Sequence, residues 1–357
     1  MKIFLTSLLK NLLLSISILS LCWVGSALGT TFTPNYTPEE DAPNAGFFDE
    51  TPSAPTASNP GNTLGEKRRY VIEHGLKLLE RVVWVPNEVG FPLEVRMKDF
   101  GGYIVGTGTS YSLSNKQGSY YGLRDDVDYT IPNLAVLTEG ESWNGYEDWE
   151  RERFGRITLT DASRFTLNTD FTEGDRFSYL PIILHEGIHI LGMGSNIGRI
   201  GDARVYTTVK QSLYDVSVRH LGADQPVPSE MTAEQQDVVK FGGDNVVWVG
   251  ESAKAHAPLV MQAGYDSMSN VNLYALNEGD TNFISSAVSH IAMQRHPDHE
   301  ESLMAPAAGN TLELGIEAYM FSDMGYGPVV DSVVTSPDTN LNALSIHTQA
   351  IVSDLVD

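Results

Sequence analysis

Two histidines and a glutamate within five residues have the types and spacing to hold and use a metal ion. They are His185, Glu186 and His189, in the stretch L-H-E-G-I-H-I-L-G-M-G-S from Leu184 to Ser195. Four residues apart on a helix, the two imidazoles share one face with Cβ atoms roughly 5–6 Å apart. Both ring nitrogens can then bind one zinc ion at about 2.0–2.1 Å. Glu186 lies toward the same open side, where it can take a proton from a water molecule that zinc activates. The spacing indicates a zinc hydrolase.

A chance occurrence of this pattern is the alternative, because the chain has nine histidines in 357 residues. The neighbouring positions argue against it. Most of them are apolar, which predicts a largely buried helix from about Ser178 to Met193. Imidazoles and a carboxylate in such a helix are costly unless a metal ion or hydrogen bonds compensate. Gly192 follows His189 by three residues and predicts the turn that ends the helix.

The first 29 residues have the pattern of a secretory signal peptide. Lys2 and Lys10 come before a mostly apolar run, Leu12 to Val24, and small residues then allow cleavage after Ala27 or Gly29. The apolar run is too short to span a bilayer comfortably. We therefore expect secretion, with the periplasm as the alternative location, and no membrane contact once the signal is removed.

The cysteine content and the net charge limit the kinds of site and partner expected for this chain. The only cysteine, Cys22, lies in the predicted signal, so the mature chain forms no disulfide and binds no metal through a thiolate. An exported chain without cysteine indicates a bacterial source. Loss of the signal, which holds two lysines and no acidic residue, takes the formal net charge from −23 to −25. Such an acidic chain repels nucleic acid and anionic membranes, so we expect neither as a partner.

Composition and periodicity divide the rest of the chain. Residues 30–66 are rich in Pro, Thr, Asn and Ser and predict a disordered linker or short propeptide. Helical spacing of apolar residues predicts a helix from about Glu66 to Val83. Alternation and β-branched residues predict strands over 93–97, 103–109, 131–137 and 246–249, with edge segments at 157–160 and 165–168. Helices are expected over 209–221 and 232–241. Helix, strands and then a buried helix predict an α+β upper lobe.

An acidic turn, Asp125-Asp126-Val127-Asp128, could hold calcium. A solvated loop is the favoured interpretation, and nothing else in the sequence supports a calcium site.

The third zinc ligand does not follow from the motif itself. A catalytic zinc usually has three protein ligands, and extended metzincin motifs place a third histidine ten residues after the first, where this chain has Ser195. Three histidines are candidates further on, namely His290, His296 and His299. An acidic third ligand, Asp215 or Glu230, is the remaining alternative.

The segment from Val288 to Met324 resembles the leishmanolysin-type metzincins and their bacterial secreted relatives. Those proteins have HExxHxxG, a long insertion, a Ser-His pair shortly before a Leu-Met-x-Pro Met-turn, and a closing helix. The resemblance implies one zinc ion, Glu186 as general base, and a protein or peptide substrate. Matched residue by residue, it gives these site residues: zinc ligands His185, His189 and His290, turn glycine Gly192, Met-turn methionine Met304, and a closing helix over Leu314 to Met324.

The same resemblance implies a metzincin-like two-lobed zincin with a mixed sheet, an active-site helix and a Met-turn. The peptidase domain would cover residues 67–327, with an upper lobe at 67–192, a lower lobe at 193–327, and a C-terminal tail at 328–357. Two features depart from the family pattern. Gly187 inside the motif costs about 1 kcal/mol of helix propensity relative to alanine, and the stretch between His290 and Met304 is longer than usual.

Two other functions are compatible with these residues. One is a non-catalytic secreted binding or surface protein with a structural zinc, although a structural site does not need Glu186. The other is a zinc hydrolase of non-peptide amides, such as those of a cell wall. Tyr319 and Tyr326 could stabilise an oxyanion in a catalytic site, but a packing role is the favoured interpretation for both.

Overall fold

The computed structural model describes residues 31–38, 46–80, 90–98, 100, 105–112, 121–140, 154–160, 165–169, 177–196, 210–221, 246–261, 265–273, 289–291, 304 and 315–326. It is an α+β protein with a mixed sheet, as the sequence predicts. The predicted signal peptide, the C-terminal tail and the expected helix at 232–241 lie outside these ranges. Within them, no helix combines the length and the apolar composition that crossing a membrane requires.

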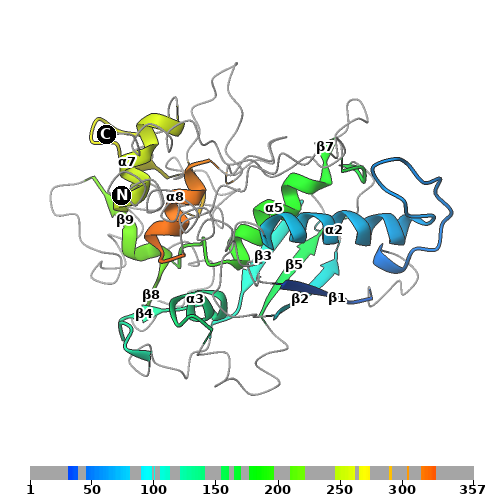
Figure 1. Cartoon of the computed structure of the whole chain (residues 1–357), viewed down its shortest axis with the longest axis horizontal. Coiled ribbons are helices and arrows are strands. Elements are labelled where there is room, and N and C mark those ends of the chain that lie inside the picture. Colours follow the sequence, from blue (N-terminus) through cyan, green and yellow to red (C-terminus); the bar gives the residue numbers. More distant parts are fainter. Residues whose placement is uncertain are drawn as a thin grey trace, which may run out of the picture.

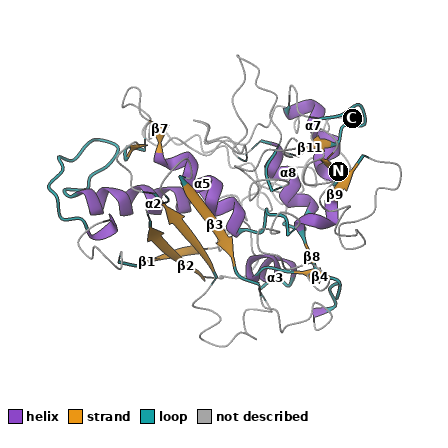
Figure 2. Ribbon diagram, turned by 180° about the vertical axis from the view of Figure 1, so that it is seen from behind, coloured by secondary structure: helices purple, strands orange, loops and turns teal. Residues whose placement is uncertain are grey.

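A four-stranded sheet forms the centre of the first half of the chain. Its strand order is β1 (Thr31–Tyr36), β2 (Gly90–Met97), β5 (Gly155–Leu159) and β3 (Gly106–Ser110). The first three strands are parallel, and β3 runs antiparallel to β5 at one edge. Two helices, α2 (Leu64–Glu80) and α5 (Tyr179–Ile190), lie together on one face of the sheet (Figures 1 and 2).

Alternation places the apolar side of each strand under these helices. In β2 the side chains of Phe91, Leu93 and Val95 are fully buried, while the alternating Glu94 and Arg96 are only partly covered. Phe91 stacks on Phe154 with ring centroids 3.8 Å apart. The sheet therefore supplies a rigid apolar floor for α2 and α5.

The remaining elements are smaller. They are η1 (Gly46–Phe48), β4 (Val127–Asp128), α3 (Ile131–Leu137), β6 (Phe165–Thr166), β7 (Phe177–Ser178), β8 (Gln211–Ser212), η5 (Tyr214–Ser217), β9 (Val218–His220), β10 (Val246–Trp248), α7 (Glu251–Val260), β11 (Val271–Asn272) and α8 (Ile316–Asp323). Strands β9, β10 and β11 form an antiparallel sheet, and α7 packs against α8. The Asp323 carboxylate accepts hydrogen bonds from Trp248 Nε1 at 3.0 Å and from the Ser252 N–H at 2.7 Å.

Two elements of the predicted upper lobe make contacts beyond residue 192. Strand β4 pairs in parallel with β8, and Asn133 in α3 donates to the Tyr326 hydroxyl at 3.1 Å. The lobe boundary predicted at residue 192 therefore does not separate the contacts of these two elements.

Several predicted elements are confirmed with small shifts of their ends. The helix expected from about Glu66 to Val83 is α2, the buried helix of the motif is α5, and the strands at 93–97 and 246–249 are β2 and β10. Strand β3 confirms 106–109 of the strand expected at 103–109.

Three predicted elements are wrong. Residues 131–137 form helix α3 rather than a strand, because Thr130 caps it: the Thr130 hydroxyl accepts the Asn133 N–H, and the Asn133 side chain bonds the Thr130 N–H in return. Residues 155–159 form an interior strand between β2 and β3, not an edge segment. Residues 211–220 form β8, η5 and β9 rather than one helix.

The disorder expected for a linker over 30–66 is also wrong where the structure describes these residues, while the alternative of a short propeptide stays a prediction. Strand β1 is part of the main sheet, and Phe32 and Phe47 are buried in the core. Their burial offsets the cost of ordering a Thr- and Pro-rich chain. Composition alone does not show that these two aromatic side chains reach the core.

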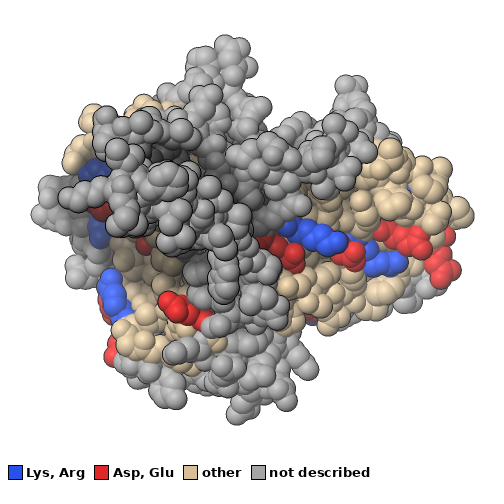
Figure 3. Space-filling view, in the orientation of Figure 1, with Lys and Arg blue, Asp and Glu red and all other residues tan. Residues whose placement is uncertain are grey.

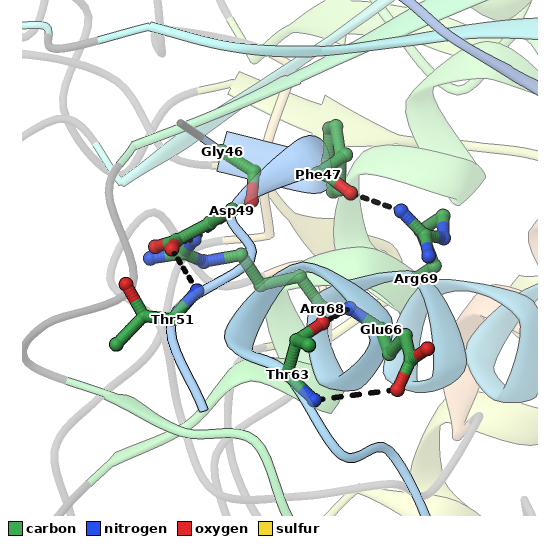
Figure 4. A network of polar contacts seen from close by, with 8 residues as sticks. All are labelled: Gly46, Phe47, Asp49, Thr51, Thr63, Glu66, Arg68 and Arg69. Atoms are coloured by element: carbon green, nitrogen blue, oxygen red, sulfur yellow. Dashed lines mark hydrogen bonds and ion pairs between the residues drawn. The ribbon is translucent and has the colours of Figure 1, made fainter. Parts of the chain in front are cut away.

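Helix α2 holds this N-terminal segment through polar contacts (Figure 4). The Arg68 guanidinium donates to the Gly46 carbonyl at 2.7 Å and to the Asp49 carboxylate at 3.0 Å. Arg69 donates to the Phe47 carbonyl, and Glu66 accepts the Thr63 N–H at the start of the helix. The segment before α2 is therefore an integral part of the fold.

The exposed face of α2 carries both positive and negative side chains. Along the face drawn in Figure 3, described Lys and Arg side chains alternate with Asp and Glu where α2 lies. Among the described residues along α2 in this view, neither sign of charge forms a continuous patch.

Replacement of Arg68 by methionine removes both donors from a mostly buried site. We expect Arg68→Met to lower the free energy of unfolding by about 2–3 kcal/mol, because the Gly46 carbonyl and the Asp49 carboxylate lose their partner. Chemical denaturation measures this. Arg124→Met is the control, because the Arg124–Asp126 pair is about half exposed on both sides and should contribute less than about 0.5 kcal/mol. Equal effects of the two variants would contradict the structural role of the N-terminal segment.

Gly187, the unusual residue of the motif, lies where α5 meets α2. A Cβ at this position would come within 2.1 Å of Leu79 Cδ1. A larger residue would have to displace the fully buried Leu79 side chain, so the contact with α2 gives a packing reason for glycine at this position.

We expect Gly187→Ala to destabilise the metal-free protein by about 1–3 kcal/mol through overpacking against Leu79. Thermal or chemical unfolding of the metal-free chain measures this. Gly90→Ala is the control, because a Cβ there meets nothing within 4 Å. In the double variant Leu79→Ala, Gly187→Ala the two losses should partly cancel, and strictly additive losses would exclude the proposed contact.

Candidate metal centre

Local sequence and packing together define helix α5. The Ser178 hydroxyl caps it by accepting the Leu180 N–H at 3.3 Å, and Pro181 lies in the first turn, where its missing N–H costs nothing. The helix is buried on most sides because α2 covers one flank and strands β3 and β5 another. His185 and His189 are only half-buried, so they lie on the side that the core leaves open.

The structure brings three histidines together, two from α5 and the third from residue 290. His290 Nε2 lies 3.1 Å from His185 Nε2 and 3.3 Å from His189 Nε2. One nitrogen from each imidazole lies within 4.8 Å of the others. The three histidines are therefore close enough to hold a metal ion.

These distances fit a tetrahedral ion. Nitrogens bound at about 2.0–2.1 Å to one tetrahedral zinc lie about 3.3–3.4 Å from one another. Protons alone satisfy the arrangement poorly, because a proton on His290 Nε2 can point to only one of the two facing nitrogens. Convergence of three ring nitrogens is typical of a metal centre.

His189 is held in the tautomer that metal binding requires. Its Nδ1 lies 2.6 Å from the Met193 carbonyl oxygen and donates to it, which leaves Nε2 unprotonated toward the other histidines. Burial lowers the pKa of His189, and the bond to Met193 opposes this shift. A neutral imidazole is the form that binds zinc.

Glu186 lies beside edge strand β3. A Cβ at Gly106 would come within 2.7 Å of Glu186 Oε1, and one at Gly108 within 2.2 Å of the Glu186 backbone oxygen. The two glycines therefore allow the strand to pass directly against the glutamate. Burial raises the pKa of Glu186 to about 8, and a hydrogen bond from the Gly108 backbone opposes that rise. The carboxyl group is thus suited to exchange a proton near neutral pH.

The end of α5 is fixed at Gly192, as the sequence predicts. Gly192 has φ +96°, a backbone conformation that favours glycine, and a Cβ there would come within 2.5 Å of Asn133 Nδ2. The last turn leaves the Leu191 carbonyl without a helical partner, and it accepts from Asn133 Nδ2 at 3.1 Å and from the Tyr326 hydroxyl. Tyr326 therefore has a structural contact with the helix end.

The segment that carries His290 is held by contacts with several distant parts of the chain. Ile291 forms a bridge with Leu273 and donates its N–H to the Met304 carbonyl at 3.0 Å. Met304 is fully buried, and its N–H donates to Glu317 Oε1 in α8 at 3.0 Å. The predicted Met-turn residue is therefore linked directly to the residue after His290.

The other candidate ligands do not join this group. Asp215 is fully buried and bonds to serine residues rather than to the histidines. His296, His299 and Glu230 lie outside the described residues. In the acidic turn, Asp126 pairs with Arg124 and accepts from Gln211 Nε2 at 3.1 Å. Within the described ranges, the three histidines form the one group with metal-binding geometry.

Sequence reasoning missed the polar residues behind the third histidine. The Ser195 N–H donates to Ser289 Oγ at 2.9 Å, across 94 positions of the chain. A serine before His290 was the only signal in the sequence, because a pairing at that separation has no local pattern.

No protein-family model, curated protein or solved structure matches this chain. Its chemistry is therefore inferred from its own residues.

Metal titration tests the histidine group. We expect the purified protein to bind one zinc ion per chain, and His290→Ala to weaken binding by more than about 100-fold, beyond the effect of a residue that only contacts a ligand. Competition with a chromogenic chelator measures both. His256→Ala is the matched control, because His256 stacks on Tyr319 with centroids 3.9 Å apart and does not belong to the group. Unchanged affinity in His290→Ala would rule out His290 as a ligand.

Proposed function

We propose that this protein is a secreted zinc metalloendopeptidase. The observation that carries the proposal is the convergence of His185, His189 and His290 next to a buried glutamate at the edge of a sheet. Zinc is the favoured ion because it accepts three imidazole ligands in tetrahedral geometry, with a fourth position left for water or substrate. When bound, it supplies a Lewis acid that polarises a carbonyl group and increases the acidity of water.

Glu186 is the proposed general base. It directly follows ligand His185 on α5, and its carboxylate is held by the backbone of Gly108. One carboxylate oxygen accepts a proton from the attacking water and later delivers it to the nitrogen of the leaving amine. Glu186 therefore takes up and releases the same proton and ends the cycle as a carboxylate. A purely structural metal site has no use for such a carboxylate, which favours an enzyme over a binding protein.

Strand β3 supports a peptide as the substrate. It is the edge strand of the sheet, and of the described strands only β5 pairs with it. Backbone N–H and C=O groups on the other side of an edge strand can pair with an extended peptide. A peptide in that position would run beside Glu186, because Gly106 and Gly108 bring β3 against that residue. This geometry favours peptide bonds over non-peptide amides.

The architecture supports a metzincin-like two-lobed zincin. A mixed sheet with an antiparallel edge strand packs against α5, the helix with His185 and His189. The buried Met304 is hydrogen-bonded to the residue after His290.

Export is part of the same proposal and rests on the signal-like pattern of residues 1–29. A bacterial source is inferred from the cysteine-free mature chain.

Cleavage of an unfolded protein tests the proposal. We expect the zinc-loaded chain to degrade unfolded casein, and Glu186→Gln to lose at least about 10²–10⁴-fold in rate while retaining zinc, because the general base is removed. Glu73→Gln is the control, because Glu73 lies on α2 and shares an exposed hydrogen bond with Tyr36. Fluorescent fragments and zinc content are measured in parallel.

Two outcomes would contradict the proposed function. If the wild type holds one zinc but cleaves neither casein nor a peptide library, a structural zinc or a non-peptide substrate replaces the peptidase hypothesis. If Glu186→Gln cleaves as fast as the wild type, Glu186 is not the base.

A further inference from the structure

Ser195 is ten residues after His185, at the position where extended metzincin motifs have a third histidine. It has a different role in this fold. Its N–H donates to Ser289 Oγ at 2.9 Å, and its hydroxyl donates to Asp215 Oδ1 at 2.5 Å. One residue therefore connects the chain just past α5 both to a buried carboxylate and to the segment that carries His290.

The Asp215 carboxylate is the centre of this connection. It is fully buried and accepts four hydrogen bonds. The donors are the Ser195 hydroxyl, the Asn196 N–H at 3.0 Å, and the Ser212 N–H and hydroxyl at 2.9 and 2.8 Å. A buried carboxylate is tolerated only when such donors surround it. Asp215 thus fixes the backbone at 195–196 relative to the turn at 212–215.

Ser289 connects this carboxylate network to His290, the residue that follows it in the chain. Ser289 is 9% exposed, and its hydroxyl oxygen accepts the N–H of Ser195, which lies just after α5. The peptide that joins Ser289 to His290 is then held on one side by this bond and on the other by the bond from Ile291 to Met304. Fixing both neighbours of His290 restricts where its imidazole can lie.

We propose that Asp215, Ser195 and Ser289 form a positioning bridge that holds His290 at the metal centre from the end of α5. The bridge rests on the metal centre of the proposed function, and none of its three residues is a metal ligand. Metal affinity and ligand geometry should therefore depend on hydroxyl and carboxylate groups that the ion does not touch.

Cobalt(II) provides a readout that a merely structural role would not change, because its visible absorption reports the number and geometry of its ligands. In full-length protein, we expect Ser289→Ala to bind cobalt(II) about 10–100-fold more weakly than the wild type, with a changed visible spectrum. Ser289→Thr keeps the hydroxyl group and should restore both the affinity and the spectrum. Asp215→Asn should behave like Ser289→Ala or worse.

Asp266→Asn is the matched control. The Asp266 carboxylate also organises a loop, accepting from the Met268 N–H at 2.7 Å and from the Asn270 N–H and side chain at 2.9 Å. These partners all lie within 266–270, so this variant tests the loss of a structural carboxylate without the connection to His290. We expect it to keep the cobalt affinity and spectrum of the wild type.

The outcomes separate the bridge from the proposed function. A wild type that binds no cobalt refutes the metal centre, and the bridge with it. A wild type that binds one ion, while Ser289→Ala binds equally tightly with the same spectrum, refutes the bridge alone. The bridge is also refuted if Asp266→Asn weakens binding as much as Ser289→Ala. If Asp215→Asn fails to fold, the comparison of Ser289→Ala with Ser289→Thr still decides.

Discussion

Three imidazole nitrogens that point toward one another are the constraint on which this structure depends. Each nitrogen must be unprotonated and held within a few tenths of an ångström of its place, since lone pairs 3.1 and 3.3 Å apart repel unless an ion or a proton lies between them. Two of the rings come from one buried helix, which fixes their Cα and Cβ atoms relative to each other. The third comes from an irregular segment that hydrogen bonds must hold in position.

The contacts that pack α5 against its neighbours also position the side chains of the candidate metal centre. Leu79 on α2 fills the space beside Gly187, while strand β3 fills the space beside Glu186. The helix therefore has little freedom to rotate, and a rotation would move both histidines and the glutamate at once. A glycine inside the motif, which is unfavourable for an isolated helix, is explained by the neighbouring helix.

Sequence reasoning succeeds here where the information is local. The four-residue spacing of His185 and His189 and the apolar surroundings of α5 predict the metal helix and its end at Gly192. It fails where two local patterns compete: β-branched Ile131 and Val136 favour a strand, but the reciprocal bonds of Thr130 and Asn133 start a helix. It fails also for residues 31–38 and 46–63, where composition indicates disorder but buried Phe32 and Phe47 provide the compensating contacts. The link from Ser195 to Ser289 has no local pattern.

The separation of the ligands along the chain has a consequence for biosynthesis. His290 follows His185 by 105 positions and His189 by 101, so closing the site closes a long loop, which carries an entropic cost. A nascent chain that ends before residue 290 holds only two of the three histidines. The complete ligand set is therefore present only late in synthesis, after the residues of the main sheet and of α5 have been made. Metal binding would then stabilise the closed loop by mass action. Under the proposed function, the chain would complete its metal centre only after most of its own sequence has folded, when it is no longer an unfolded substrate.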